Sequence, residues 1–203
     1  MLYLVTNRKL AKINFYQVIE EAVAGGVDAI ILREKDLSTQ ALKKMAMKIK
    51  ECIQKHPVKL MVNSNLQVAR EIEGAGCHIP FSFMLKEKPA FNGLLGVSVH
   101  SLEEAVIAEK NGANYLLAGH VFETRCKEGM KPRGIQWIQS LKEEVNIPVI
   151  AIGGIHQQNL PHLLETGVDG IAVMSLIMEA ENPYRVTKQL KEIMSKKFPT
   201  FNL

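Results

Sequence analysis

The segment from residue 147 to residue 175 restricts the fold more than any other part of the chain. It contains two short apolar runs rich in valine and isoleucine, 147–155 and 167–175, and the residues between them place leucines at helical spacing. Strands that are apolar on both faces are typical of a parallel sheet covered on both sides. The segment is therefore predicted to form a strand, a helix and a second strand parallel to the first.

A glycine pair and a serine follow these two predicted strands. Gly153 and Gly154 have no Cβ, so their backbone can approach a ligand closely and turn amide N–H groups outward. Met174 and Ser175 begin a second group of amides. Paired turns after the last two strands of a (β/α)8 barrel are a recurrent phosphate site. We predict phosphate binding there, although Gly153 and Gly154 alone are also typical of a tight turn.

The rest of the chain repeats this design in architecture rather than in sequence. Helical patterns end at a glycine, as at Gly25 and Gly112, and an apolar run follows, because glycine readily adopts the left-handed conformation that ends a helix. Strands are predicted over residues 2–6, 29–34, 59–63, 77–81, 94–100, 115–122, 149–153 and 171–175. Helices are predicted from Asn14, from Ser38, over 66–73, 101–111, 134–145 and 157–165, and from Asn182, whereas 84–91 is too short and lysine-rich to be assigned.

Strands that alternate with helices in this way predict a single (β/α)8 barrel domain over residues 1–203. Each unit has about 25 residues, close to the lower limit for such a barrel. A doubly wound open sheet also alternates strands and helices, but no Gly-x-Gly-x-x-Gly motif follows the first predicted strand. The barrel is therefore the favoured fold.

Composition argues against several classes of function. The net charge is only +4 and aromatic residues make up 6% of the chain, so small anionic molecules are more suitable partners than nucleic acid. The cysteines share no metal or redox spacing, which favours reduced thiols in the cytoplasm. A strand pattern begins at Leu2 and charged residues follow it, so neither a signal peptide nor a membrane span is expected. Exposed helix faces are compatible with pairing between copies of the chain, so a homo-oligomer stays an open alternative.

In a (β/α)8 barrel the catalytic side chains come from the carboxyl ends of the strands. The polar residues predicted at those ends include two histidines, several cationic side chains and the serine of the phosphate turn. They are Thr6, Arg33, Glu34, Lys35, Asn63, Ser64, His100, His120, Thr124, Lys127 and Ser175.

Arg33, Glu34 and Lys35 end the second predicted strand. Side chains alternate along a strand, so Arg33 and Lys35 are expected on one side and Glu34 on the other. A guanidinium group binds planar anions through two hydrogen bonds, which suits Arg33 with Lys35 to a carboxylate or a phosphate. A solvated charge cluster at the start of a loop is the alternative interpretation.

His120 ends an apolar strand pattern and follows a glycine. An ordinary histidine pKa near 6.5 allows the ring to accept and donate a proton near neutral pH, so His120 is a candidate acid/base, with a satisfied core histidine as the alternative. His100 is a weaker candidate, and His78 is expected to be structural. No pair of histidines has the spacing of a helical metal site, so no protein metal site is predicted.

Seven short motifs together resemble the thiamine phosphate synthase superfamily in order and spacing. The resemblance covers nearly the whole chain, and it implies a (β/α)8 barrel with a phosphate site at Gly153, Gly154 and Ser175. It also implies a role in making or salvaging the thiazole half of thiamine. The motifs are Leu32-Arg33-Glu34-Lys35, Val62-Asn63, His78-Ile79, Gly96-Val97-Ser98-Val99-His100, Gly119-His120-Val121-Phe122-Glu123-Thr124, the run from Pro148 to Ile155 and the run from Gly170 to Ser175.

Several positions depart from the pattern of a synthase in this superfamily. Synthases hold Mg²⁺ with aspartates after the third and fourth strands, where this chain has Ser64 and the acid-free stretch Pro80-Phe81-Ser82-Phe83. Mg²⁺ prefers carboxylate oxygens, so neither a metal nor a cofactor is expected. Ile31 replaces a glutamine of the synthases, and His120 replaces a proline.

The turn at residues 119–124 resembles that of a sister branch, the thiazole tautomerases. This resemblance implies a cofactor-independent isomerase that converts a carboxythiazole phosphate to its aromatic tautomer, with His120 as general acid/base. Arg33, with Lys35 or Lys127, would neutralise the substrate carboxylate. Asn63, His100, Thr124 and Met174 complete the expected substrate-binding set. Two alternatives remain: a thiamine phosphate synthase that joins a thiazole phosphate to a pyrimidine pyrophosphate, and a non-catalytic protein that senses thiazole phosphate.

Overall fold

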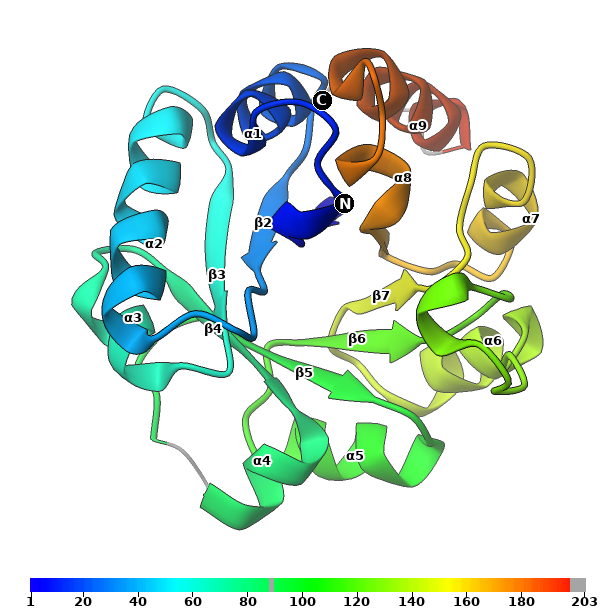
Figure 1. Ribbon diagram of the computed structural model, residues 1–203. Coiled ribbons are helices and arrows are strands. Elements are labelled where there is room, and N and C mark those ends of the chain that lie inside the picture. The colour runs from blue at the N-terminus through cyan, green and yellow to red at the C-terminus, as the bar shows by residue number, and fades with distance from the viewer. Residues whose placement is uncertain (88–89, 198–203) are drawn as a thin grey trace, which may run out of the picture.

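The computed structural model describes residues 1–87 and 90–197. Eight parallel strands form a closed barrel in chain order, β8 pairs with β1, and helices surround the barrel (Figure 1). The predicted (β/α)8 fold is confirmed. The strands are β1 (Leu2–Val5), β2 (Ala29–Leu32), β3 (Lys59–Asn63), β4 (Gly76–Pro80), β5 (Leu95–Val99), β6 (Tyr115–Gly119), β7 (Val149–Ile152) and β8 (Gly170–Val173). The helices are η1 (Arg8–Leu10), α1 (Phe15–Ala24), α2 (Thr39–Ile53), α3 (Leu66–Glu71), α4 (Phe81–Glu87), α5 (Leu102–Lys110), η2 (Arg125–Lys127), α6 (Ile135–Glu144), α7 (Leu160–Leu164), α8 (Ser175–Met178) and α9 (Pro183–Lys197).

Two apolar clusters explain why the strands lack a polar face. In β1, Tyr3 and Val5 point into the barrel, where they belong to an inner cluster with Tyr115. Leu2 and Leu4 belong instead to a larger cluster that also contains the buried faces of the helices. Both sides of each strand are therefore covered, as expected for a parallel barrel.

Most strands end earlier than the sequence predicts, because residues at their carboxyl ends leave the sheet to form side-chain contacts. The strand predicted over 29–34 ends at Leu32. The carboxylate of Glu34 accepts hydrogen bonds from the Thr6 hydroxyl (2.8 Å) and from the Arg8 amide (2.9 Å). Similarly, the strand predicted to reach residue 122 ends at Gly119. The polar residues at these strand ends therefore lie in loops that face the end of the barrel.

Helix α4 is a correction to the sequence prediction. The sequence leaves the segment 84–91 unassigned, whereas a helix starts at Phe81, directly after β4, and places Met84 in the core. Residues 88 and 89 of that segment lie outside the described residues. Side chains cap the start of α5. The Ser101 hydroxyl accepts from the Glu104 amide (3.1 Å), and the Glu104 carboxylate accepts from the amide of His100 (2.6 Å).

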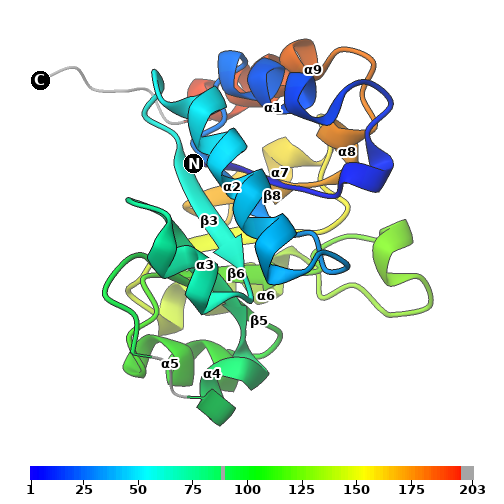
Figure 2. The same ribbon diagram turned by 60° about the vertical axis from the view of Figure 1, so that its left-hand side comes forward.

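Loops that follow the strands gather at one end of the barrel. Figure 2 shows η1, α8 and the green loop that carries η2 projecting from the same side. This is the end at which enzymes of this fold place their active sites. Within the part of the chain that the structure describes, no helix has the length and apolarity needed to cross a membrane.

Candidate active site

One cavity of about 390 Å³ opens at the carboxyl ends of the strands. Its volume falls within the range of small-molecule sites, roughly 300–1,000 Å³. The structure brings every residue of the predicted site to its lining: Arg33, Lys35, Asn63, His100, His120, Thr124, Lys127, Gly153, Gly154, Met174 and Ser175. The candidate residues therefore lie together in one cavity, while their assignment as the functional site and the role of each side chain stay predictions.

The cavity is cationic. Arg33, Lys35 and Lys127 line it, and no aspartate or glutamate does so among the described residues. None of the three forms an ion pair with any residue within 1–87 and 90–197. Glu34, the acid between the first two, is buried beside Thr6 and Arg8. Such a lining favours an anionic ligand.

The turn after β7 requires glycine at two consecutive positions. Gly153 and Gly154 have φ angles of 105° and 67°, in the region that residues with a Cβ rarely adopt. A Cβ on Gly153 would collide with the Cβ of His120, and one on Gly154 would collide with the carbonyl of Glu123. The backbone of this turn thus packs directly on the loop after β6.

Residues of this turn and of the turn after β8 line the same cavity. Gly153, Gly154, Met174 and Ser175 all line it, and no side chain caps the start of α8. The first amides of a helix have no partner within the helix. Backbone N–H groups that converge from two turns are suited to bind a phosphate.

His120 is buried (6% exposed) and its ring is held by the following loop. Nε2 lies 3.1 Å from the backbone carbonyl of Met130. A carbonyl only accepts hydrogen bonds, so Nε2 carries the proton and donates. The backbone carbonyl of His120 accepts from the Arg133 amide (3.0 Å), which fixes the loop from its other side.

His100 also lines the cavity, directly after β5, the strand that pairs with β6, and burial holds the pKa of its ring below the usual 6.5. Glu104, with Oε2 3.5 Å from Nδ1, acts against this shift, whereas the charges of Lys127 and Arg133 add to it. His100 is therefore uncharged at neutral pH, and the positive charge of the cavity comes from its arginine and lysines.

The buried His78 and the half-buried Ser98 form a hydrogen-bonded pair that the sequence analysis did not identify. Both line the cavity. Nε2 of His78 lies 2.8 Å from the Ser98 hydroxyl, and Nδ1 lies 3.0 Å from the Tyr115 hydroxyl. Burial lowers the pKa of His78 to about 3. Strand alternation could have identified Ser98 as a candidate. It lies two residues before His100, which directly follows β5, and side chains two residues apart lie on the same side of a strand.

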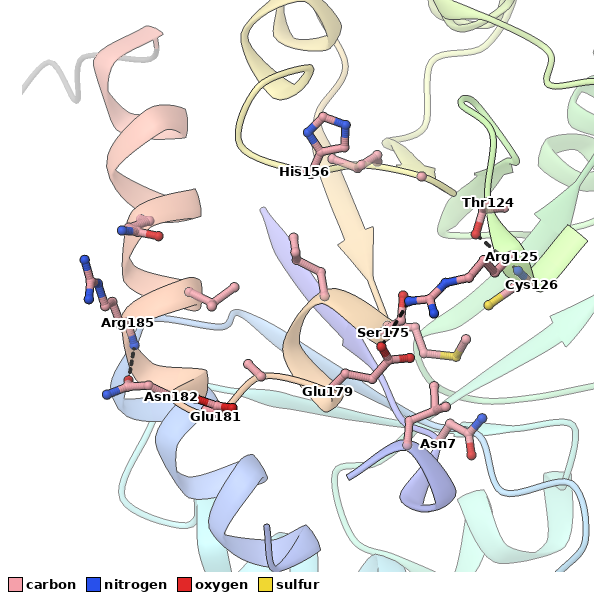
Figure 3. A pocket seen from close by; sticks show the side chains of 18 of the residues that line it. Asn7, Thr124, Arg125, Cys126, His156, Ser175, Glu179, Glu181, Asn182 and Arg185 are labelled. Atoms are coloured by element: carbon pink, nitrogen blue, oxygen red, sulfur yellow. Dashed lines mark hydrogen bonds and ion pairs between the residues drawn. The ribbon is translucent and has the colours of Figure 1, made fainter. Parts of the chain in front are cut away.

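A larger groove of about 1,050 Å³, drawn in Figure 3, shares part of its lining with the cavity. It lies between η2, α8 and the start of α9, and it shares Thr124 and Ser175 with the cavity. Arg125 crosses the groove to Glu179, with 3.2 Å between Nη2 and Oε2 (Figure 3). No strand residue lines the groove among the described residues, whereas residues of all eight strands line the smaller cavity, so we assign the chemistry to the cavity.

The comparison with known proteins decides the family. The profile of the family described as thiamine monophosphate synthase matches residues 2–177. The chain belongs to this family. Thiamine-phosphate synthase from Clostridium acetobutylicum is 38% identical, over 96% of this chain and 95% of its own. Its counterpart from Methanobrevibacter smithii is 38% identical, over 96% of each chain. The solved structure of thiamine phosphate pyrophosphorylase from Pyrococcus furiosus superposes with a TM-score of 0.85 at 34% identity, over 97% of this chain and 96% of its own.

These findings correct the function predicted from the sequence. The expected thiazole tautomerase, an isomerase with His120 as general acid/base, is wrong, because the relatives matched over nearly their full length are named thiamine-phosphate synthases, which are transferases. The prediction gave too much weight to a few rim positions, such as Ser64 and His120. Identity distributed along the whole chain outweighs them.

Mg²⁺, which the family resemblance implies for a synthase, does not fit the residues present. Ser64 faces the cavity after β3, and α4 starts immediately after β4 without an acidic residue in its first turn. Among the described residues, no group of three or more histidine, cysteine, aspartate or glutamate side chains could hold a metal ion. A hard divalent cation would lack the carboxylates that it prefers.

Proposed function

We propose that this protein is a thiamine-phosphate synthase. In the proposed reaction the bond between a pyrimidine methylene carbon and pyrophosphate breaks, and the nitrogen of a thiazole phosphate bonds to that carbon. The products are thiamine phosphate and pyrophosphate, so atoms and charge balance without a redox step. The observation that carries the proposal is the full-length identity to thiamine-phosphate synthases together with a cavity built for anions at the strand ends.

Two separate sets of groups support binding of two phosphorylated substrates. The amides around Gly153 and Ser175, at the ends of β7 and β8, suit the phosphate of the thiazole. Arg33 and Lys35, which follow β2, and Lys127 in the loop after β6 suit the pyrophosphate. Cations placed beside a departing pyrophosphate stabilise its developing charge and so lower the barrier to bond cleavage.

The test is formation of thiamine phosphate from the two purified substrates. The product is oxidised to fluorescent thiochrome and quantified, and released pyrophosphate is measured in parallel, because the proposal requires equal amounts of both. Lys127→Met should lower kcat/KM about tenfold or more, the cost of one charged hydrogen bond. Arg125→Met is the matched control, since Arg125 belongs to the same loop but pairs with Glu179 in the outer groove.

Two outcomes would contradict the proposal. If calorimetry shows binding of thiazole phosphate but no product forms at any Mg²⁺ concentration, the protein is a non-catalytic binder. If neither substrate binds, the cavity serves another class of ligand.

A further inference from the structure

We infer that the cavity binds a pyrophosphate group without a divalent cation, with Arg33, Lys35 and Lys127 supplying the positive charge. The inference rests on the proposed function and deepens it. It starts from the disagreement between the family's use of Mg²⁺ and the side chains that line this cavity, which include no carboxylate among the described residues.

The three cations lack the acidic partners that several other cations of the molecule have. Arg8 pairs with Glu34 and Asp36, and Lys142 pairs with Asp169 at 2.6 Å. Arg33, Lys35 and Lys127 have no acidic partner in the described part of the chain, although Arg33 and Lys127 are half-buried. Partly buried like charges repel one another unless an anion binds between them. The lining is therefore complete only with an anion in place.

The charge arithmetic favours pyrophosphate over a metal complex. Mg²⁺ at the same place would add two positive charges to a lining that already carries three and, among the described residues, includes no carboxylate to offset them. Pyrophosphate carries several negative charges, and its oxygens suit the forked donors of a guanidinium and the point charges of two ammonium groups. The side chains thus provide the neutralisation that Mg²⁺ would otherwise supply.

Calorimetric titration with inorganic pyrophosphate tests this inference. We expect binding in EDTA at least as tight as in excess Mg²⁺, because the metal would neutralise the ligand before it meets the cations. Lys127→Met and Arg33→Met should each weaken binding in EDTA about tenfold or more. Arg125→Met should leave it within about twofold, because this exposed side chain pairs with Glu179. The inference would be overturned if pyrophosphate bound only with Mg²⁺, or if Arg125→Met lost as much affinity as Lys127→Met and Arg33→Met.

A second variant places an acid in the cavity. Ser64→Asp puts a carboxylate where Ser64 now has a positive φ of 57°, a conformation that aspartate tolerates better than most residues. It should weaken pyrophosphate binding in EDTA about tenfold, and Mg²⁺ should restore the binding. An unchanged affinity in EDTA would count against charge as the basis of binding. Circular dichroism and titration with thiazole phosphate show whether the variant is folded.

The two proposals fail in different ways. Pyrophosphate binding in EDTA without any thiamine phosphate formation leaves this inference standing and removes the synthase activity. Thiamine phosphate formation that depends on Mg²⁺, with no pyrophosphate binding in EDTA, leaves the synthase activity standing and removes this inference.

Discussion

The Nε2 atom of His78 lies 2.8 Å from the hydroxyl oxygen of Ser98, at the floor of the cavity. On its other side, Nδ1 of His78 lies 3.0 Å from the Tyr115 hydroxyl. Burial keeps His78 neutral and raises the pKa of Tyr115 well above its usual value, so each group holds one proton. If Tyr115 donates to Nδ1, then Nε2–H donates to Ser98, and the Ser98 proton points elsewhere. This arrangement satisfies every group and presents Ser98 to the cavity as a hydrogen-bond donor.

Removal of this donor should affect catalysis. Ser98→Ala should lower kcat/KM for thiamine phosphate formation roughly tenfold, because an acceptor on the substrate loses its partner in a site with little water. Ser82→Ala, on the exposed side of α4, should leave kcat/KM unchanged. Steady-state kinetics with each substrate varied in turn make the measurement. An unchanged value in Ser98→Ala would show that no substrate atom bonds to this hydroxyl.

The buried His78 predicts a pH dependence of stability. Its folded-state pKa of about 3 lies below the 6.5 of an exposed histidine, so the unfolded chain binds one more proton between these values. The contribution of His78 to stability is full above pH 6.5 and is lost as the pH falls toward 3, by about 1.4 kcal/mol per pH unit. Urea unfolding at pH 6, 5 and 4 measures the slope. His78→Gln should flatten the slope by that amount, and parallel slopes for parent and variant would contradict the assignment.

The glycine pair after β7 should tolerate no side chain. Gly154→Ala combines a positive φ with a collision against the Glu123 carbonyl, so we expect destabilisation of about 3 kcal/mol and weaker binding of thiazole phosphate. Gly167→Ala is the matched control, because its φ of 74° is also positive but no atom lies within 4 Å of the added Cβ. The control should cost about 1 kcal/mol and leave the affinity unchanged. Thermal unfolding measures the loss of stability, and calorimetric titration with thiazole phosphate measures the loss of affinity.

Thr187 offers a stabilising substitution outside the site. Its buried hydroxyl has no hydrogen-bond partner among the described residues. Thr187→Val keeps the shape and removes an unpaired polar group, so the free energy of unfolding should rise by about 1 kcal/mol. Thr166→Val is the opposite case, because the Thr166 hydroxyl donates to the Leu163 carbonyl (2.7 Å) and accepts from the Val168 amide (3.3 Å). It should destabilise by a similar amount, and urea unfolding of both variants checks the difference in sign.

Local pattern in the sequence was sufficient to predict the barrel and to place the candidate residues at one of its rims. Apolar runs such as that of β7 identify buried parallel strands, and helical leucines such as Leu160 and Leu163 identify the helices between them. In a closed parallel barrel the carboxyl ends of all strands lie at one rim, so residues far apart in sequence, such as Arg33 and Lys127, were expected together from strand order alone. The structure places both in one cavity.

Only the tertiary structure showed which groups at the rim satisfy one another. Glu34 and Lys35 are adjacent and both charged, yet Glu34 is held by Thr6 and Arg8 while Lys35 faces the cavity unpaired. His78 and Ser98 belong to different strands, and their hydrogen bond depends on the register of β4 against β5. Sequence periodicity reports which side of an element faces the core, but hydrogen bonds and ion pairs depend on distances between elements, and packing of the closed barrel sets those distances.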